Sequence, residues 1–157
     1  MLPDNLKEHA VAVSVEAFDA DAVTAGTFDL GELTLEIPAA KIFSVCGFLK
    51  YDQQFVRLSS VTAVDRYPVE PRFEVVYHLH SIQRNQRLRL KCRLAGDAAE
   101  IESVTGVWRG ANWYERETWD LFGIRFRNHP DLKRILMPDD WEGHPLRKDY
   151  PVTGTRV

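Results

Sequence analysis

Residues 73–81 read F-E-V-V-Y-H-L-H-S, and residues 88–94 read L-R-L-K-C-R-L. In both stretches apolar side chains occupy every second position, which is the period of a strand with one buried face. The polar residues 83–86 between them, Q-R-N-Q, suit a turn. The sequence therefore predicts an antiparallel hairpin that has one apolar face and one basic face.

Shorter patterns on both sides of the hairpin extend the sheet. Residues 32–37 alternate as a strand, and residues 55–64 are predicted to form another. Between them, Pro38 stands where a first helical residue would, and residues 39–49 carry apolar side chains at nearly helical spacing. At the N-terminus, Asp4 is a candidate cap for a short helix that runs to about Val11. Together these elements predict an α+β fold, with a mixed or antiparallel sheet and helices packed on one face.

The chain of 157 residues has the size and composition of one globular domain. We expect this domain to span residues 1–122. Residues 123–157 have no sustained period and are punctuated by prolines, yet they carry large apolar side chains that a disordered tail would lack. We interpret them as an extended C-terminal arm that is ordered against its own domain or against partner subunits.

Residues 112–124, N-W-Y-E-R-E-T-W-D-L-F-G-I, are the most informative segment of the chain. They predict a helix over residues 112–122 with Asn112 as its N-cap, Glu115 at the capping-box position and Gly123 as its stop. Arg116 and Asp120 are four residues apart and can pair. Three interpretations of the charges remain open: an internal ion-pair network, an interface with arginines of another chain, and a solvated face.

Candidate catalytic and metal sites are weak in this sequence. Carboxylates on one helix turn cannot easily stand on both sides of a substrate, so acid–base catalysis is disfavoured. His78 and His80 point the same way on a strand, but a third metal ligand is not evident. Cys46 and Cys92 cannot hold an iron–sulfur cluster alone, and no dinucleotide- or phosphate-binding glycine motif is present. The basic row of residues 87–93 suggests a nucleic-acid-binding module as an alternative, although the net charge is −3 and stacking aromatics are lacking.

The segment from Trp113 to Ile124 resembles the C subunit of the NADH–quinone oxidoreductase, respiratory complex I. The resemblance continues through residues 128–136, N-H-P-D-L-K-R-I-L, and residues 141–151, W-E-G-H-P-L-R-K-D-Y-P. Thr118 departs from the pattern, since such proteins usually have a hydrophobic residue there. The resemblance makes these interface or structural residues: Trp113, Glu115, Arg116, Glu117, Asp120, His129, Trp141, His144, Arg147, Lys148, Asp149 and Tyr150.

The resemblance also implies a function. It implies a non-catalytic peripheral-arm subunit without a cofactor or metal of its own, on the cytoplasmic side of the cell inner membrane. FMN and the iron–sulfur clusters would lie in other subunits. The implied partners are the large quinone-site subunit, of the D type, and iron–sulfur subunits of the B and I types. The whole enzyme would pass electrons from NADH to quinone and move protons; related membrane-bound hydrogenases carry a similar module.

Overall fold

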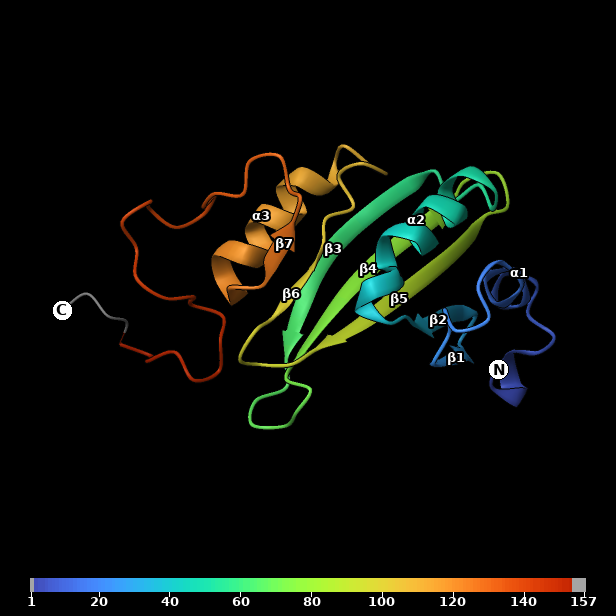
Figure 1. The fold of residues 1–157 in the computed structure, drawn as a ribbon, viewed down its shortest axis with the longest axis horizontal. Helices are drawn as coiled ribbons and strands as arrows, with labels where there is room; N and C mark the ends of the chain where they lie inside the picture. Colours follow the sequence, from blue (N-terminus) through green and yellow to red (C-terminus); the bar gives the residue numbers. More distant parts are fainter. Residues whose placement is uncertain (1, 154–157) are drawn as a thin grey trace.

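A five-stranded mixed sheet forms the centre of the protein, which we describe from a computed structural model over residues 2–153 (Figure 1). The strand order is β1-β2-β5-β4-β3. The predicted hairpin is confirmed: β4 (Phe73–Ser81) and β5 (Gln86–Leu94) pair antiparallel along their whole length. β3 (Arg57–Asp65) extends the sheet on one side of the hairpin, and β2 (Glu32–Glu36) pairs parallel with β5 on the other.

Two helices, one between β2 and β3 and one after β6, cover one face of the sheet, as predicted. α2 (Ile42–Tyr51), preceded by the short η2 (Ala39–Lys41), and α3 (Ala111–Phe122) contribute to the same apolar core as the inward side chains of β4 and β5. Phe73, Val75, Tyr77 and Leu79 are all buried on this side. The α+β class with a mixed sheet is therefore confirmed, and the core lies between the sheet and α2 and α3 (Figure 1).

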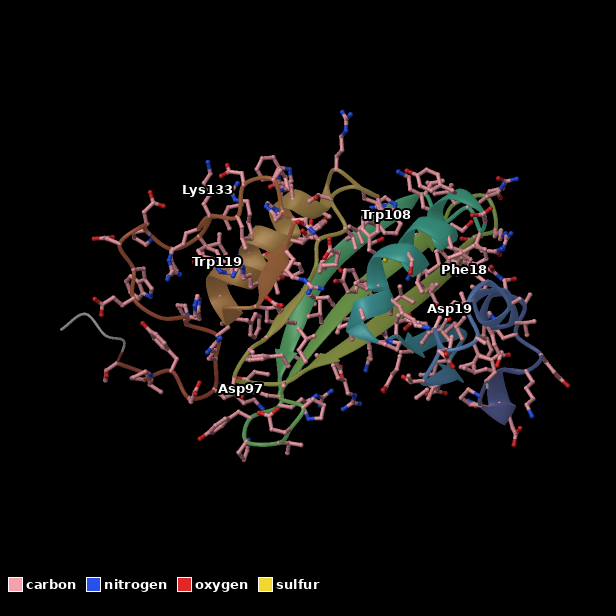
Figure 2. All side chains as sticks on the ribbon, in the orientation of Figure 1. Phe18, Asp19, Asp97, Trp108, Trp119 and Lys133 are labelled. Atoms are coloured by element: carbon pink, nitrogen blue, oxygen red, sulfur yellow. The ribbon has the colours of Figure 1, made fainter. Side chains whose placement is uncertain are left out.

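The N-terminal prediction was wrong in its boundaries. Residues 4–6 form only one turn, η1 (Asp4–Leu6), and the helix α1 runs from Ala10 to Phe18. His9 is in an extended conformation between them, so one helix cannot span both. α1 is fastened to its neighbours by Phe18, whose ring stacks on Phe48, and by Asp19, which pairs with Lys41 at 2.6 Å; Phe18 and Asp19 are labelled in Figure 2.

Three short strands escaped the sequence patterns. β1 (Ala25–Asp29) is mostly exposed, so it has no apolar alternation to detect. Residues 125–127 form β7 (Arg125–Arg127), which pairs parallel with β6 (Glu100–Glu102) in a second small sheet. Ile124 and Phe126 are buried, so the core continues past residue 122 into the first residues of the predicted arm. The last residues of that arm, 154–157, lie outside the described residues, as does Met1.

A buried ion pair joins the end of β3 to the start of β4. Arg72 donates to both carboxylate oxygens of Asp65, through Nε at 2.9 Å and Nη2 at 2.8 Å. Both side chains are almost fully buried. The Arg72 guanidinium holds the pKa of Asp65 far below its usual range. A two-pronged pair of this kind is more specific in geometry than a single charge contact.

No helix of residues 2–153 is long and apolar enough to cross a membrane. Among the same residues, no three histidine, cysteine or carboxylate side chains are grouped so that they could share a metal ion. Both cysteines are buried and free.

Replacing Arg72 with methionine should strongly destabilise the protein, because it leaves the Asp65 carboxylate buried without its cation. We expect the free energy of unfolding in urea at neutral pH to fall by about 3–5 kcal/mol. Arg66→Met is the matched control: Arg66 is half-exposed, and its partner Glu74 also contacts Lys91. The control should lose no more than about 1 kcal/mol, and equal losses in the two variants would contradict the assignment.

Candidate functional site at the junction of α3 and the C-terminal arm

The predicted helix exists, but its beginning differs from the expectation. α3 begins at Ala111 with Gly110 at the N-cap, and no side chain caps it, so the predicted capping by Asn112 is wrong. Glu115 does not turn back to the helix start. Its fully buried carboxylate instead accepts hydrogen bonds from Ser103 Oγ at 2.6 Å and from the Val104 backbone N–H at 2.7 Å. Glu115 thus fastens α3 to the loop that follows β6.

Burial dominates the titration of Glu115. Loss of hydration raises its pKa to about 7, against the opposing effect of the two donors at Ser103 and Val104. His129 lies 3.9 Å from the same carboxylate, and burial lowers the pKa of this histidine. The contact between them is therefore polar rather than ionic at neutral pH. His129 also lies within hydrogen-bonding distance of the Asn112 carbonyl, at 3.3 Å.

Asp120 lies at the other end of α3 and organises the arm. It is fully buried, and one carboxylate oxygen accepts from three consecutive backbone N–H groups, those of residues 135, 136 and 137, at 2.8–3.0 Å. The other oxygen accepts from Arg134 Nη1 at 2.7 Å. Burial opposes the charge on this carboxylate, but the four donors outweigh burial and the pKa of Asp120 is lowered. The predicted pairing of Arg116 with Asp120 is wrong, since Arg134 is the cation that binds it.

The arm also satisfies the backbone carbonyls at the end of α3, which have no partner within the helix. Arg134 and His144 both contact the Asp120 carbonyl, the Leu146 N–H donates to Leu121, and Arg147 Nε donates to Phe122. Gly123 ends the helix as predicted, with a φ of 75°. A side chain at this position would collide with His144 and Arg147, so glycine is required for space as well as conformation.

Beyond α3, the arm is fastened to the ion pair at the base of the sheet. Asp149 accepts from Arg72 at 2.6 and 3.1 Å, and the Lys148 N–H donates to Asp65 at 2.8 Å. Arg147 lies over the Phe73 ring. Residues 123–149 therefore form a strap that is bound to its own domain at two buried carboxylates, Asp120 and Asp65.

The outward side of α3 contrasts with its buried side. Trp113 is 59% exposed, and Glu117, one turn later, is exposed and its side chain has no hydrogen bond or ion pair within residues 2–153. Arg116 lies over the Trp113 ring and donates to the carbonyls of residues 133 and 134. The neighbouring arm residues Ile135 and Leu136 expose apolar side chains.

Leu146, further along the arm, also exposes its apolar side chain. Trp119, by contrast, lies on the side of α3 that faces the arm, with Arg134 over its ring (Figure 2). α3 therefore packs on the core along one side and against the arm along another, and Trp113 and Glu117 project away from both.

The predicted site residues therefore divide into two groups. The first holds the junction together from inside: Glu115, Arg116, Asp120, His129, Trp141, His144, Arg147, Asp149 and Tyr150. Here Trp141 contributes its carbonyl to Arg134, and Tyr150 OH donates to the Glu142 carbonyl at 3.5 Å. The second presents side chains outward: Trp113, Glu117 and Lys148.

Sequence reasoning missed four residues that complete the junction: Ser103, Arg134, Asp65 and Arg72. Arg134 lies inside the stretch that carried the resemblance, and that was a usable signal. Asp65 and Arg72 lie at the end of one strand and just before the next, without any motif that points to the arm. Thr118, noted as polar where a hydrophobic residue is usual, is buried and donates to the Tyr114 carbonyl within its own helix.

Comparisons with known proteins agree with this geometry. The solved structure titled "Nqo5 of the trypsin-resistant fragment (1-134) in P63 form" superposes with a TM-score of 0.67 at 29% identity, over 78% of this chain and 98% of that one. A chain of the membrane-bound sulfane sulfur reductase, an archaeal respiratory membrane complex, superposes with a TM-score of 0.77 at 27% identity, over 90% and 84% of the two chains.

Sequence relatives are closer in identity. A C subunit of NADH-quinone oxidoreductase from Rhizobium etli, numbered 2 in that organism, is 55% identical over 75% of this chain and 64% of its own length. The C subunit of the same enzyme from Geobacter sulfurreducens is 52% identical over 79% of this chain and 77% of its own length. The mitochondrial 30.4 kDa subunit of NADH-ubiquinone oxidoreductase from Neurospora crassa is 47% identical over 78% of this chain, which spans 44% of that protein.

The protein has an α+β fold of the kind seen in the two solved structures. The model of the family described as "Respiratory-chain NADH dehydrogenase, 30 Kd subunit" matches residues 35–156. The chain belongs to this family, and the relatives named above include the C subunit of NADH-quinone oxidoreductase.

Removing the titration of Glu115 should change how stability depends on pH. Its folded pKa of about 7 is raised above the ordinary 4.5, so its contribution is present below pH 4.5 and is lost as pH rises through 7. The free energy of unfolding in urea should therefore be compared between Glu115→Gln and the native chain at pH 5 and at pH 8. From pH 5 to pH 8 the stability of the variant should rise relative to that of the native chain, by up to about 3 kcal/mol. Glu117→Gln on the exposed side is the control, and a pH-independent difference for Glu115→Gln would contradict the assignment.

Substituting Asp120 with asparagine should release the arm without unfolding the sheet. An amide cannot pair with Arg134 as a carboxylate does, and it places an N–H group where the buried site offers donors. We expect amide hydrogen exchange at residues 135–137 to accelerate by about a hundredfold, equivalent to ~3 kcal/mol. Asp131→Asn makes the same chemical change at an exposed arm position that pairs with Lys133. Similar exchange rates in both variants would rule out Asp120 as the anchor.

Proposed function

We propose that this chain is a non-catalytic peripheral-arm subunit of a proton-translocating NADH:quinone oxidoreductase. In this role it holds the large quinone-site subunit and neighbouring iron–sulfur subunits in place while electrons pass from NADH to quinone. The observation that carries the proposal is the division of α3 into a side fixed by internal hydrogen bonds and a side that presents Trp113 and Glu117 outward. Membership of the respiratory-chain NADH dehydrogenase 30 Kd subunit family supports the choice of complex in which this surface would bind a partner.

The outward surface has the composition of an interface. We call Trp113, Glu117, Ile135, Leu136 and Leu146 the docking surface; its apolar members are between 39% and 59% exposed. Large exposed apolar side chains grouped with few charges mark protein contacts. Glu117 adds a carboxylate that a basic group of a partner can bind. The backbone N–H groups of residues 135, 136 and 146 are hydrogen-bonded to α3, so these members of the docking surface are held in place before a partner binds.

A scaffolding role fits the chemistry of the buried carboxylates better than a catalytic role. Glu115 and Asp120 are both fully buried, and their oxygens are occupied by donors of the same chain. A catalytic acid or base must reach a substrate. We therefore propose that the redox groups, FMN and iron–sulfur clusters, belong to partner subunits.

The proposed partners are the large subunit of the D type and the iron–sulfur subunits of the B and I types. The proposed position is peripheral, on the cytoplasmic side of the cell inner membrane, with membrane contact through partners only. Trp113 and Leu136 are well suited to bury against a large neighbouring subunit, because aromatic and aliphatic anchors at the centre of a contact supply most of its energy.

A second candidate is the equivalent subunit of a related membrane-bound complex, such as an energy-converting hydrogenase. The superposition with a chain of the sulfane sulfur reductase favours keeping it, because a similar fold occurs in a complex with a different reaction. The two candidates share the same docking role and differ in the neighbouring large subunit. Affinity purification of the tagged chain from detergent-solubilised membranes, with identification of the co-purifying subunits, distinguishes them.

The docking role predicts a defect in assembly rather than in chemistry. Glu117→Ala and Trp113→Ala should each weaken the contact by about 1–3 kcal/mol, roughly fivefold to a hundredfold in affinity. The amount of assembled complex should fall, while NADH–quinone turnover per assembled complex stays near the native value. Native gels quantify assembly, and activity is normalised to complex content. Glu8→Ala, an exposed carboxylate near the N-terminus, is the control and should assemble normally. Normal assembly with collapsed turnover would refute the scaffold role.

A further inference from the structure

The face of the sheet that points away from α2 and α3 carries the predicted run of basic residues on β5, and most of that run is neutralised within the chain. Arg89 pairs with Glu32 at 2.7 Å, and Arg93 pairs with Glu36 at 3.1 Å. Lys91 pairs with the buried Glu74 at 3.2 Å. These three cations therefore do not form a free positive strip along β5, which removes the main support for a nucleic-acid-binding hairpin.

One line of side chains across the strands of this face is different. The strand registers place Arg57 of β3 opposite His80 of β4, and His80 opposite Arg87 of β5. Paired residues of neighbouring strands project to the same side, so the three side chains form a line across the sheet. Within residues 2–153 none of the three side chains makes a hydrogen bond or ion pair, and both arginines are exposed. We call Arg57, His80 and Arg87 the transverse row.

The transverse row lines a hollow of about 360 Å³ on the sheet. Ser59, His78 and Arg89 complete its polar rim. Among its described lining residues the one carboxylate is Glu32, and its charge is already matched by Arg89. His78 is likewise engaged, by Ser60 at 3.0 Å and by Arg89 at 3.2 Å. The hollow thus keeps an unmatched positive charge between Arg57 and Arg87.

We propose that the transverse row is a second docking site, which binds an extended acidic segment of a partner protein. Adjacent strands lie about 4.8 Å apart, so Arg57 and Arg87 stand roughly 10 Å apart across β4. Two carboxylates two residues apart in an extended segment project to the same side about 7 Å apart. The long side chains of glutamate and arginine cover the remaining difference. Such a segment, lying across the strands, can offer one carboxylate to each arginine, which recognises carboxylates through paired N–H groups.

A protein segment fits this surface better than a nucleic acid does. No phenylalanine, tyrosine or tryptophan ring, the usual platforms on which bases stack, lines the hollow among its described residues. The chain as a whole carries a net charge of −3, which does not favour a polyanion as long as a nucleic acid. A short acidic segment needs only the local charge of two arginines.

The transverse row lies on the opposite side of the sheet from α3, so both docking surfaces can be occupied at once. The acidic specificity of the row is independent of the proposed function, but the location of its partner in the same complex rests on that function. Two experiments are therefore needed, one on the full chain alone and one on the assembled complex.

The first experiment measures binding of a fluorescent hexaglutamate peptide to the full chain at low ionic strength. The double variant Arg57→Gln/Arg87→Gln should weaken binding by about tenfold, because it removes both cations that face the hollow. The matched control Arg109→Gln/Arg125→Gln removes two exposed cations on segments that flank α3, with an expected change under about twofold.

Three outcomes of this peptide-binding experiment count against the proposal. Equal weakening by the two double variants, or no binding by the native chain, would overturn it. Stronger competition by inorganic phosphate or by a single-stranded oligonucleotide at matched charge would overturn the acidic-peptide assignment.

The second experiment uses the assembled complex. A photo-crosslinking residue replaces Ser59, which is exposed at the rim of the hollow. The expected product joins this position to a partner segment that contains at least two carboxylates within a few residues. A crosslink to lipid, to a segment without carboxylates, or to nothing would overturn the proposal. If the peptide binds as expected and the Glu117→Ala complex assembles normally, the acidic-segment site at the transverse row is supported while the proposed function fails. The two failures are therefore distinguishable.

Discussion

The carboxylate of Asp120 is the interaction on which the arm depends. The segment after β7 has no regular secondary structure, and an irregular backbone must find partners for its N–H and C=O groups outside itself. One carboxylate oxygen of Asp120 accepts from three consecutive N–H groups of this segment. The guanidinium of Arg134, also in this segment, donates to the Asp120 carbonyl at the end of α3. Because the carboxylate and the guanidinium are both largely buried, neither can be removed without leaving the other unmatched.

The same logic recurs at the far end of the strap. Asp65 binds Arg72 within the sheet and also accepts from the Lys148 N–H, while Arg72 extends to Asp149. The base of the sheet and the end of the arm thus share one charged cluster. Its two ends differ in exposure, since Asp65 is nearly buried and Asp149 is 42% exposed. The outer pair is screened by solvent, so we infer that the arm opens more readily from its end than from Asp120.

The sequence was most informative where structure follows from local periodicity. The alternation in residues 73–94 was sufficient to predict the hairpin and its buried face, and Gly123 marked the end of α3. Glu115 shows the limit of such patterns, because a glutamate three residues after a candidate cap has the same spacing whether it caps the helix or turns into the core. The partner of Asp120 could not be found either: helical spacing suggests Arg116, and the actual partner lies across a loop. The contact of Arg72 with Asp149, 77 residues apart, leaves no local trace at all.

The motif that carries the family resemblance is largely used inside the chain. Glu115, Asp120, Arg134 and His144 determine how α3 and the arm fit together, so they identify a fold more directly than they identify a partner. Trp113, Glu117 and Lys148 of this motif face outward, as do the exposed apolar side chains of the strap and, outside the motif, the transverse row on the opposite side of the sheet. Two structures that share the fold while one comes from a sulfane sulfur reductase are consistent with this separation. Differences between such complexes are therefore to be sought in these outward residues, because they can change without disturbing the buried carboxylates that hold the subunit together.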